Sequence, residues 1–390
     1  MSAGHPTTLT VVGMAADSCL SLESAEIVRL ERTATAQNSV ELLQRGEVMG
    51  IAVAEDGTLI IADRLRSPHL WRVDTLGVVS PFALPEEVQE LLQEPAIGLH
   101  VRRDGGVGFW HMPSATAVEL AADGSLRARV AVAAPPGAVS QIAFDPGGGL
   151  YVEYLPDSTR RLVRYFALPA DTGAYEDIPL PSMDSVLPLI RAEHNGFPVT
   201  RPLPFHPAPH WAPLGDGQVV WTDGASFRLR AVGAGGSATL FCYAEFPRAV
   251  VSAIERTDHE ERITWMNRFT DSNWTWSGPR IPEYHAAIED VKVDPDGRVW
   301  STTPIASRIL PQGTGWLFFR ANPDSPIVKT AQRYELHLLT PGRTSPLRMQ
   351  LPEALDARLW AARGGHFWGI SIDYRTYDVE LIHFRLVPGR

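Results

Sequence analysis

The sequence lacks the marks of a membrane protein and of a disulfide-rich protein. Only 2 of its 390 residues are cysteines, Cys19 and Cys242, which are too few for a disulfide framework. No stretch approaches the ~20 apolar residues of a membrane span. Residues 1–8 do not combine a basic region with a long apolar core. We therefore expect a cytoplasmic protein with no membrane partner.

Positive charge is also scarce. The chain has 35 Lys and Arg against 45 Asp and Glu, a formal net charge of −10 at pH 7. It contains no basic run interleaved with aromatic residues, so nucleic acid is a poor partner. There is no Gly-x-Ser-x-Gly nucleophile motif. The glycine-rich turn at 146–149 has no Lys-Ser or Lys-Thr after it, which excludes a phosphate-binding loop.

What the sequence does contain is a glycine-centred hairpin pattern that recurs six times. The first copy, residues 50–63, reads as an apolar strand, an Asp-Gly turn and a second apolar strand. Such a turn requires positive φ, which glycine adopts without strain. The six turn glycines are Gly57, Gly105, Gly148, Gly217, Gly297 and Gly365.

Further strands follow most copies of the hairpin, a third as at 161–166 and a fourth as at 238–242. Four antiparallel strands repeated around an axis form β-propeller blades. The last copy lacks a fourth strand, and an N-terminal strand at 8–12 or 25–30 would complete it and remove an exposed sheet edge. The sequence thus predicts one all-β domain over 1–390, a six-bladed β-propeller. A β-sandwich is the alternative.

Two copies resemble six-bladed propellers of the NHL-like and strictosidine-synthase-like group. They are Ile51-Ala-Val-Ala-Glu-Asp-Gly-Thr-Leu-Ile-Ile-Ala-Asp63 and Val291-Lys-Val-Asp-Pro-Asp-Gly-Arg-Val-Trp300. The second half, through 210–214, 274–282 and 294–300, is similar to bacterial proteins described only as six-bladed β-propellers. The first half departs from them with a short acidic helix-like insert at 85–92. The resemblance implies a fold and carries no catalytic motif.

Three long insertions interrupt the repeats, at about 179–209, 248–280 and 303–332. Prolines make the first insertion irregular, because proline cannot donate to a strand ladder. The pattern at 248–269 predicts an amphipathic helix. All three segments carry aromatic residues, in which disordered chains are depleted. We expect them to form a cap over one mouth of the ring, and a buttress at the side of the blades is the alternative.

The hairpin register also predicts which residues approach the central channel. Seven residues before the turn glycines stand Gly50, Gly98, Gln141, His210, Asp290 and Arg358. Four of these positions are polar where a structural strand would favour small or apolar residues. Radial symmetry would bring them together as base, orienter and anion clamp. We predict that Gln141, His210, Asp290 and Arg358 are catalytic, and hydrogen bonds between neighbouring blades are their alternative role.

Other polar or aromatic residues near this mouth are expected to bind the substrate. They are His100, His111, Tyr154, His206, His285, Glu289 and Trp360. The NHL resemblance implies, from its amidating lyase, a zinc ion held by three histidines, for which His100, His210 and His285 (or His206) are the candidates. Resemblance to lactonase-type propellers implies calcium instead, for which only Gln141, Asp290 and either Glu47 or Glu153 are suitable. The expected cofactor is none or one divalent metal, zinc in preference to calcium.

Taken together, these patterns predict an enzyme that modifies a small molecule or peptide at the channel mouth without an organic cofactor. Its class would be hydrolase, lyase or isomerase. Because propellers host many functions, a non-catalytic binding scaffold is the alternative.

Overall fold

The structure is a computed structural model. It describes residues 25–36, 48–63, 70–91, 96–102, 104–111, 114–132, 138–145, 147–156, 161–166, 175–181, 188–194, 197–242, 247–319, 322–340, 346–352, 355–373 and 378–389. Among these residues, no helix combines the length and the apolar character that crossing a lipid bilayer requires.

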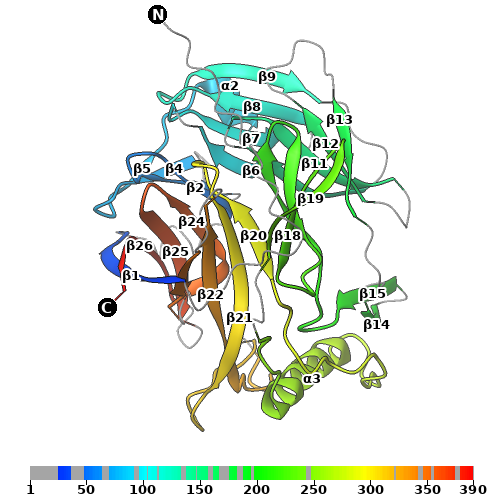
Figure 1. Cartoon of the computed structure of the whole chain (residues 1–390). Coiled ribbons are helices and arrows are strands. Elements are labelled where there is room, and N and C mark those ends of the chain that lie inside the picture. Colours follow the sequence, from blue (N-terminus) through cyan, green and yellow to red (C-terminus); the bar gives the residue numbers. More distant parts are fainter. Residues whose placement is uncertain are drawn as a thin grey trace, which may run out of the picture.

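The described chain is an all-β protein with a propeller arrangement of sheets (Figure 1). Four sheets have four strands each, in chain order. The first contains β2 (Val48–Val53), β3 (Leu59–Asp63), β4 (Leu70–Val73) and β5 (Val79–Pro81). The second contains β6 (Ala96–Val101), β7 (Val107–His111), β8 (Thr116–Leu120) and β9 (Leu126–Ala131). The third contains β10 (Ala138–Phe144), β11 (Leu150–Leu155), β12 (Leu162–Phe166) and β13 (Glu176–Pro179). The fourth contains β16 (His210–Gly215), β17 (Gln218–Thr222), β18 (Arg228–Gly233) and β19 (Gly236–Cys242).

The remaining large sheet has eight strands. Their order is β20 (Asp290–Val293), β21 (Val299–Ile309), β22 (Thr330–Leu339), β23 (Leu347–Gln350), β1 (Glu26–Thr35), β26 (Asp378–Pro388), β25 (His366–Asp373) and β24 (Leu355–Arg363). The N-terminal strand β1 joins its two halves. It pairs antiparallel with β26 and, through Glu26 and Ile27, parallel with β23. The expected strand at 25–30 is therefore confirmed, and the alternative strand at 8–12 lies outside the described residues.

The six predicted hairpins are all present. Each pairs the first two strands of a repeat antiparallel, namely β2–β3, β6–β7, β10–β11, β16–β17, β20–β21 and β24–β25. The φ angles of the six predicted turn glycines lie between 71° and 96°. A side chain would be strained at such angles, which explains why glycine recurs there.

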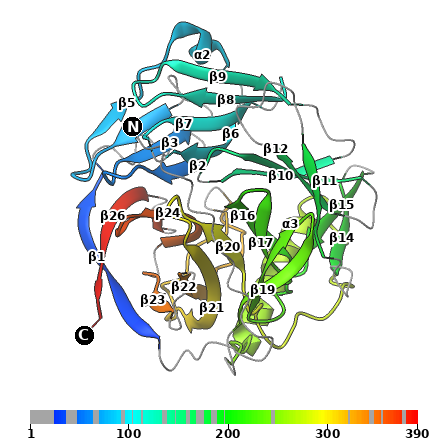
Figure 2. The same cartoon turned by 45° about the horizontal axis from the view of Figure 1, so that its top comes forward.

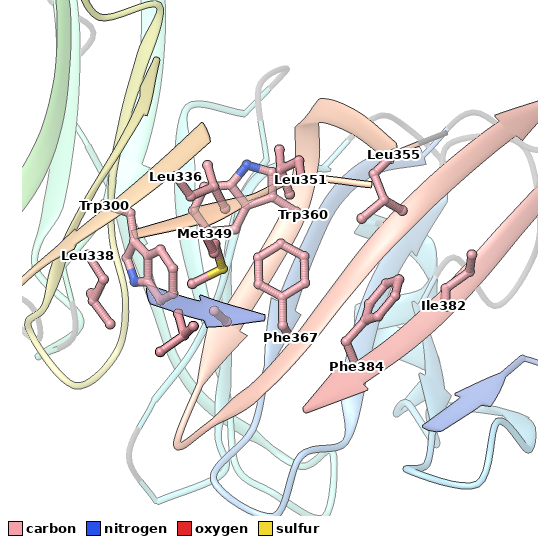
Figure 3. Packing of buried hydrophobic residues seen from close by; sticks show 12 residues of the cluster. Trp300, Leu336, Leu338, Met349, Leu351, Leu355, Trp360, Phe367, Ile382 and Phe384 are labelled. Carbon is pink, nitrogen blue, oxygen red and sulfur yellow. The ribbon is translucent and has the colours of Figure 1, made fainter. Parts of the chain in front are cut away.

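The hydrophobic core lies between neighbouring hairpins. In the cluster of Figure 3, the rings of Trp300 and Trp360 meet edge to face at 5.4 Å, and Trp360 stacks on Phe367 at 5.4 Å. Trp300 from the second strand of one hairpin thus packs against the next hairpin along the chain. Large aromatic side chains supply much of the buried area that holds adjacent hairpins together.

The acidic insert near 85–92 contains the short helix α2 (Glu86–Leu91), as the sequence predicts. The insertion at 179–209 was expected to be irregular, and this is wrong, because β14 (Leu189–His194) and β15 (Phe197–Pro202) form an antiparallel hairpin. A sheet of only two strands has edges on both sides, where proline is tolerated since no ladder bond is lost. The segment at 303–332 is also partly regular. Its first part belongs to β21, which continues to Ile309, and its last part belongs to β22, which begins at Thr330.

The insertion at 248–280 contains the predicted helix, α3 (Ala253–Arg268). It is not amphipathic in the usual sense, because its buried residues are Glu255, Asp258, Ile263 and Asn267. Their spacing still marks one helical face. This face is polar because it meets hydrogen-bonding partners from other segments, as described below.

The three insertions emerge at the same end of the sheets. Successive antiparallel strands run in opposite directions. The end of each second strand therefore lies beside the start of the first. This places three segments at the same end of the sheets: the one before β16, the one before β20 and the one that joins β21 to β22. Figure 1 shows α3, β14, β15 and the far end of β21 together at the bottom of the view. There, Ile190 and Leu203 of the first insertion share a buried cluster with Ile263 of α3.

Candidate functional site

A central cavity of about 320 Å³ lies where the first strands of the six hairpins meet. Figure 2 looks more nearly down the ring and shows these strands around the centre. Each hairpin lines the cavity with the residue five positions before its turn glycine. These residues are Ala52, His100, Ala143, Ala212, Lys292 and Trp360. The channel wall therefore follows the hairpin register, at the positions two residues after those predicted from the sequence.

Of the ring seven positions before the glycines, Gln141 and Asp290 also line the cavity. Asp290 and Lys292 are two residues apart on β20, so both face the channel, roughly 7 Å apart along the strand. The Gln141 side-chain amide donates to the carbonyl oxygen of Trp211 at 3.3 Å. This contact reaches the neighbouring sheet, as the structural alternative for this ring expected.

Lys292 brings positive charge into the cavity. Its Nζ lies 4.3 Å from the centre of the Trp360 ring and donates to the Trp360 carbonyl oxygen at 3.1 Å. The ring face attracts the ammonium group, and the backbone bond fixes its position. Lys292 was not among the residues predicted for the site, although the register that identifies His100 and Trp360 applies to it equally.

His100 is a further polar residue that lines the cavity, and its side chain is buried. Its ring stacks on Phe144 of the next sheet, with centroids 4.3 Å apart. Burial, together with the nearby Arg102 charge, lowers the pKa of His100 to about 3. The ring is therefore neutral at physiological pH. It can form hydrogen bonds there but carries no positive charge.

Arg363 is buried at the turn end of its hairpin, the sixth. Its side chain is only 2% exposed, and Nη1 donates to the Arg102 carbonyl oxygen at 3.3 Å, on a hairpin two places away in the ring. The guanidinium also lies 3.7 Å from Asp296 and 4.0 Å from Glu55. Four hairpins thus meet around one buried cation at this end. The sequence register did not include Arg363, because it belongs to the turn.

Within the described part of the chain, the other predicted site residues do not line this cavity. His210 begins β16 and pairs with Thr222 of β17, so it lies at the mouth, above the lining residues. Arg358 is in β24, and its side chain lies outside the described residues. The predicted convergence of four polar residues is therefore seen for Gln141 and Asp290 only.

The expected substrate-binding residues are divided between the cavity and other places. His100 and Trp360 line the cavity. The Tyr154 hydroxyl donates to Asp177 at 3.0 Å in the outer part of its sheet. His111 Nδ1 lies 2.6 Å from the Ser114 hydroxyl, and His206 Nδ1 donates to the carbonyl oxygen of Pro207 at 2.8 Å. Glu289 accepts a bond of 3.4 Å from the Tyr334 hydroxyl.

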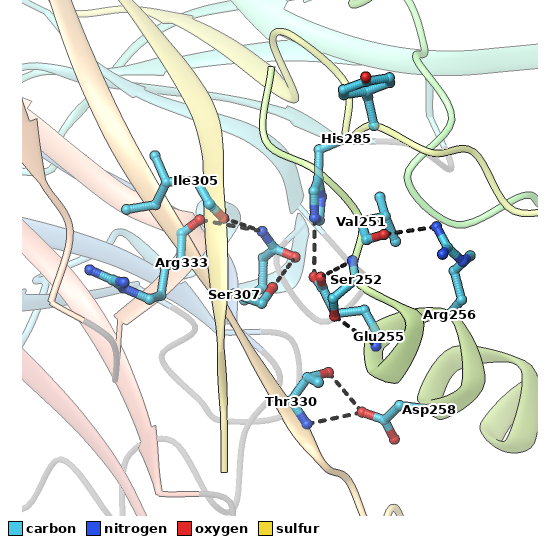
Figure 4. Close-up of polar contacts among 12 residues, drawn as sticks. Val251, Ser252, Glu255, Arg256, Asp258, His285, Ile305, Ser307, Thr330 and Arg333 are labelled. Atoms are coloured by element: carbon cyan, nitrogen blue, oxygen red, sulfur yellow. Dashed lines mark hydrogen bonds and ion pairs between the residues drawn. The ribbon is translucent and has the colours of Figure 1, made fainter. Parts of the chain in front are cut away.

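His285 belongs to a buried polar cluster under α3, shown in Figure 4. Its Nε2 donates to Glu255 Oε1 at 3.1 Å, and both side chains are almost fully buried. Burial raises the pKa of Glu255, but hydrogen bonds from His285, from Ser307 and from the Ser252 backbone outweigh it and lower this pKa to about 2. Glu255 is therefore a carboxylate that joins α3 to two other segments.

The same helix face binds the β21–β22 extension through Asp258. Its Oδ2 accepts from the backbone N of Lys329 and of Thr330, and from the Thr330 hydroxyl, at 3.1, 3.0 and 2.8 Å. This polar face was missed in the sequence, because its partners lie some 70 residues away along the chain.

No group of three or more His, Cys, Asp or Glu side chains in the described segments could hold a metal ion. The three-histidine zinc site expected from His100, His210 and His285 (or His206) is therefore wrong, since neither set of histidines comes together among these residues. His100 is in the channel, whereas His285 is bound to Glu255 beneath α3. Of the acidic residues considered for calcium, Glu153 forms an ion pair with Arg161, and Glu47 lies outside the described residues.

No protein-family model matches the sequence, and no curated protein matches it. Several solved structures have a similar arrangement. Virginiamycin B lyase from Staphylococcus aureus, in an inactive form with quinupristin, is 11% identical, with 92% of this chain and 99% of that chain covered and a TM-score of 0.40. A gluconolactonase from Xanthomonas campestris is 12% identical (94% and 93% covered, TM-score 0.41). A DUF4221 family member from Bacteroides vulgatus is 8% identical (94% and 100% covered, TM-score 0.45).

Proposed function

We propose that this chain is a six-bladed propeller enzyme that acts on a small carbonyl compound in its channel cavity. Two halves of the eight-stranded sheet, β20–β23 and β24–β26 with β1, would be the fifth and sixth blades. The single observation that carries the function is that Asp290 and Lys292, on one strand face, both line a cavity of about 320 Å³. Cavities of this size with a few convergent polar groups are typical of small-molecule sites.

In this proposal Asp290 is the general base. It takes a proton from the carbon next to the carbonyl group, or from water that attacks the carbonyl carbon. The Lys292 ammonium group stabilises the negative charge that develops on the carbonyl oxygen. Proton removal leads to a lyase or isomerase reaction and water attack to hydrolysis. The Trp360 ring and the alanines would contact the apolar part of the substrate.

We also propose that the three insertions cap the channel mouth. The supporting observation is that they emerge at the end of the sheets where Asp290 begins β20, opposite the end where Arg363 lies.

The test is ¹H NMR in D₂O with a mixture of esters, lactones and amides. The expected result is loss of an α-proton signal or formation of a product. Asp290→Asn should lower the rate by about 10²-fold or more, since general bases contribute that much. Asp123→Asn, in an exposed turn, is the matched control. Equal rates for Asp290→Asn and wild type, at equal unfolding free energy, would exclude this mechanism.

The second candidate is a binding propeller without catalysis. It is favoured by the hydrogen bonds of Gln141 and Lys292 to backbone carbonyl oxygens of neighbouring hairpins. Such contacts serve stability as well as binding. Under this alternative a compound binds in the cavity unchanged, and its α-protons persist in D₂O.

A further inference from the structure

We propose that Gln141 makes the channel cavity selective for a ligand that carries an uncharged amide or hydroxyl group. The proposal rests on the channel cavity being the ligand site of the proposed function. It adds to Asp290 and Lys292 a residue that determines which carbonyl compounds bind there.

One end of the Gln141 side chain is anchored to the neighbouring hairpin. Its amide nitrogen, Nε2, donates to the carbonyl oxygen of Trp211 at 3.3 Å. A carbonyl oxygen can only accept a hydrogen bond, so the nitrogen of the carboxamide, and not its oxygen, must face Trp211. Because the two polar atoms of a carboxamide point apart, Oε1 faces away from this contact.

The other end of the side chain has no partner among the described residues. The polar groups beside it in the same sheet are already paired, because the Ser140 hydroxyl donates to Glu153 at 2.8 Å and Glu153 forms an ion pair with Arg161. Gln141 itself is exposed and lines the cavity. A ligand in the channel can therefore reach Oε1 and the second N–H of Nε2.

The anchor also determines where in the channel the carboxamide lies. Gln141 is in β10 of the third hairpin, and Trp211 is in β16 of the fourth. Strand β16 lies beside β20, which carries Asp290 and Lys292, and Figure 2 shows β10, β16 and β20 in succession around the centre. The bond to Trp211 thus holds the carboxamide on the side of the channel where Asp290 and Lys292 lie.

The chemistry of the carboxamide defines the class of ligand. It offers one acceptor, Oε1, and one remaining N–H donor, and it does not ionise. An amide or hydroxyl group can both donate and accept, so it can pair with either atom. The carbonyl group of an ester or ketone has no hydrogen to donate to Oε1. The site should therefore prefer amides and hydroxylated carbonyl compounds to simple esters and ketones.

The experiment uses benzamide and acetophenone, two probes of nearly equal shape in which an NH₂ group replaces a CH₃ group. The full chain carries ¹⁵N in its glutamine side chains, and Gln141 is assigned as the signal missing from Gln141→Met. Benzamide should shift the Gln141 side-chain signals saturably. The Kd of acetophenone should be about twofold to tenfold higher than that of benzamide, as expected for the loss of one hydrogen bond.

The variants test whether Gln141 is the source of this preference. Gln141→Met keeps the length of the side chain and removes both polar atoms, so the ratio of the two Kd values should fall to about one. Gln350→Met is the matched control, because Gln350 is an exposed glutamine at the end of β23 that does not line the cavity. It should leave the ratio as in the wild type.

Three results would overturn the proposal. Equal Kd values for the two probes in the wild type, or a wild-type ratio in a folded Gln141→Met variant, would show that Gln141 does not select the ligand. Saturable benzamide binding that leaves the Gln141 signals unmoved would do the same, although the channel site of the proposed function would still stand. An absence of saturable binding by either probe would also contradict it. Activity in D₂O is measured separately, so a catalytic failure does not mimic these outcomes.

Discussion

Replacing Asp258 by alanine should detach α3 from the β21–β22 extension. The Asp258 carboxylate has no solvent exposure and accepts three hydrogen bonds from Lys329 and Thr330. The alanine would leave two backbone N–H groups and one hydroxyl without their partner. If each buried unsatisfied group costs about 1–3 kcal/mol, a partly relaxed site loses roughly 3–5 kcal/mol.

The assay is hydrogen exchange of the α3 amides under native conditions, with urea unfolding measured in parallel. A loss of this size should speed exchange in α3 by about 100-fold or more, while amides of the four-stranded sheets change little. Glu261→Gln is the matched control on the same two segments, because the pair between Glu261 and Lys329 is 44% and 43% exposed. Exposed pairs contribute about 0–1 kcal/mol. Equal exchange in the two variants would refute the argument that the buried polar face holds this helix.

Two further predictions concern other parts of the fold. His366 Nδ1 lies 3.0 Å from His383 Nε2, and burial, followed by the neighbouring His366 charge, lowers the pKa of His383 to about 4. Below pH ~6.5 the unfolded chain then binds more protons than the folded chain. The free energy of unfolding should therefore be highest above that pH and fall by at most about 3 kcal/mol towards pH 4. Urea unfolding should show a weaker decline for His383→Gln, and an identical decline would contradict the assignment. Ser252→Ala should cost about 1 kcal/mol by removing the capping box in which Ser252 and Glu255 bond to each other's backbone. Ser252→Thr should restore the stability in the same measurement, and failure to do so would point to another cause.

The parts of the fold that local chemistry determines were predictable from the sequence. Gly57 and its five equivalents have positive φ because tight hairpins require it. Those glycines also fix the register, because strand residues alternate between two faces. The same count places Ala52, Ala143 and Ala212 on the cavity wall. Short-range rules were therefore sufficient for the hairpins and for the channel-facing positions.

The parts that depend on distant partners were not predictable in this way. The buried face of α3 contains Glu255 and Asp258, and a pattern of apolar residues cannot reveal a face that binds by hydrogen bonds. Arg363 is buried because carbonyl and carboxylate groups of three other hairpins surround it. His285 was assigned to the channel from its position in the sequence, whereas its partner Glu255 holds it beneath α3.

The central claim is that strands distant in the sequence converge on one cavity that binds a ligand. Alanine methyl groups provide the most direct test, because Ala52, Ala143 and Ala212 line the cavity from three different sheets. In a chain with ¹³C-labelled alanine methyls, benzamide should shift these three signals together, with one common Kd. Exposed Ala122 should not respond. Shifts confined to one sheet, or shifts that occur only at exposed alanines, would contradict the account.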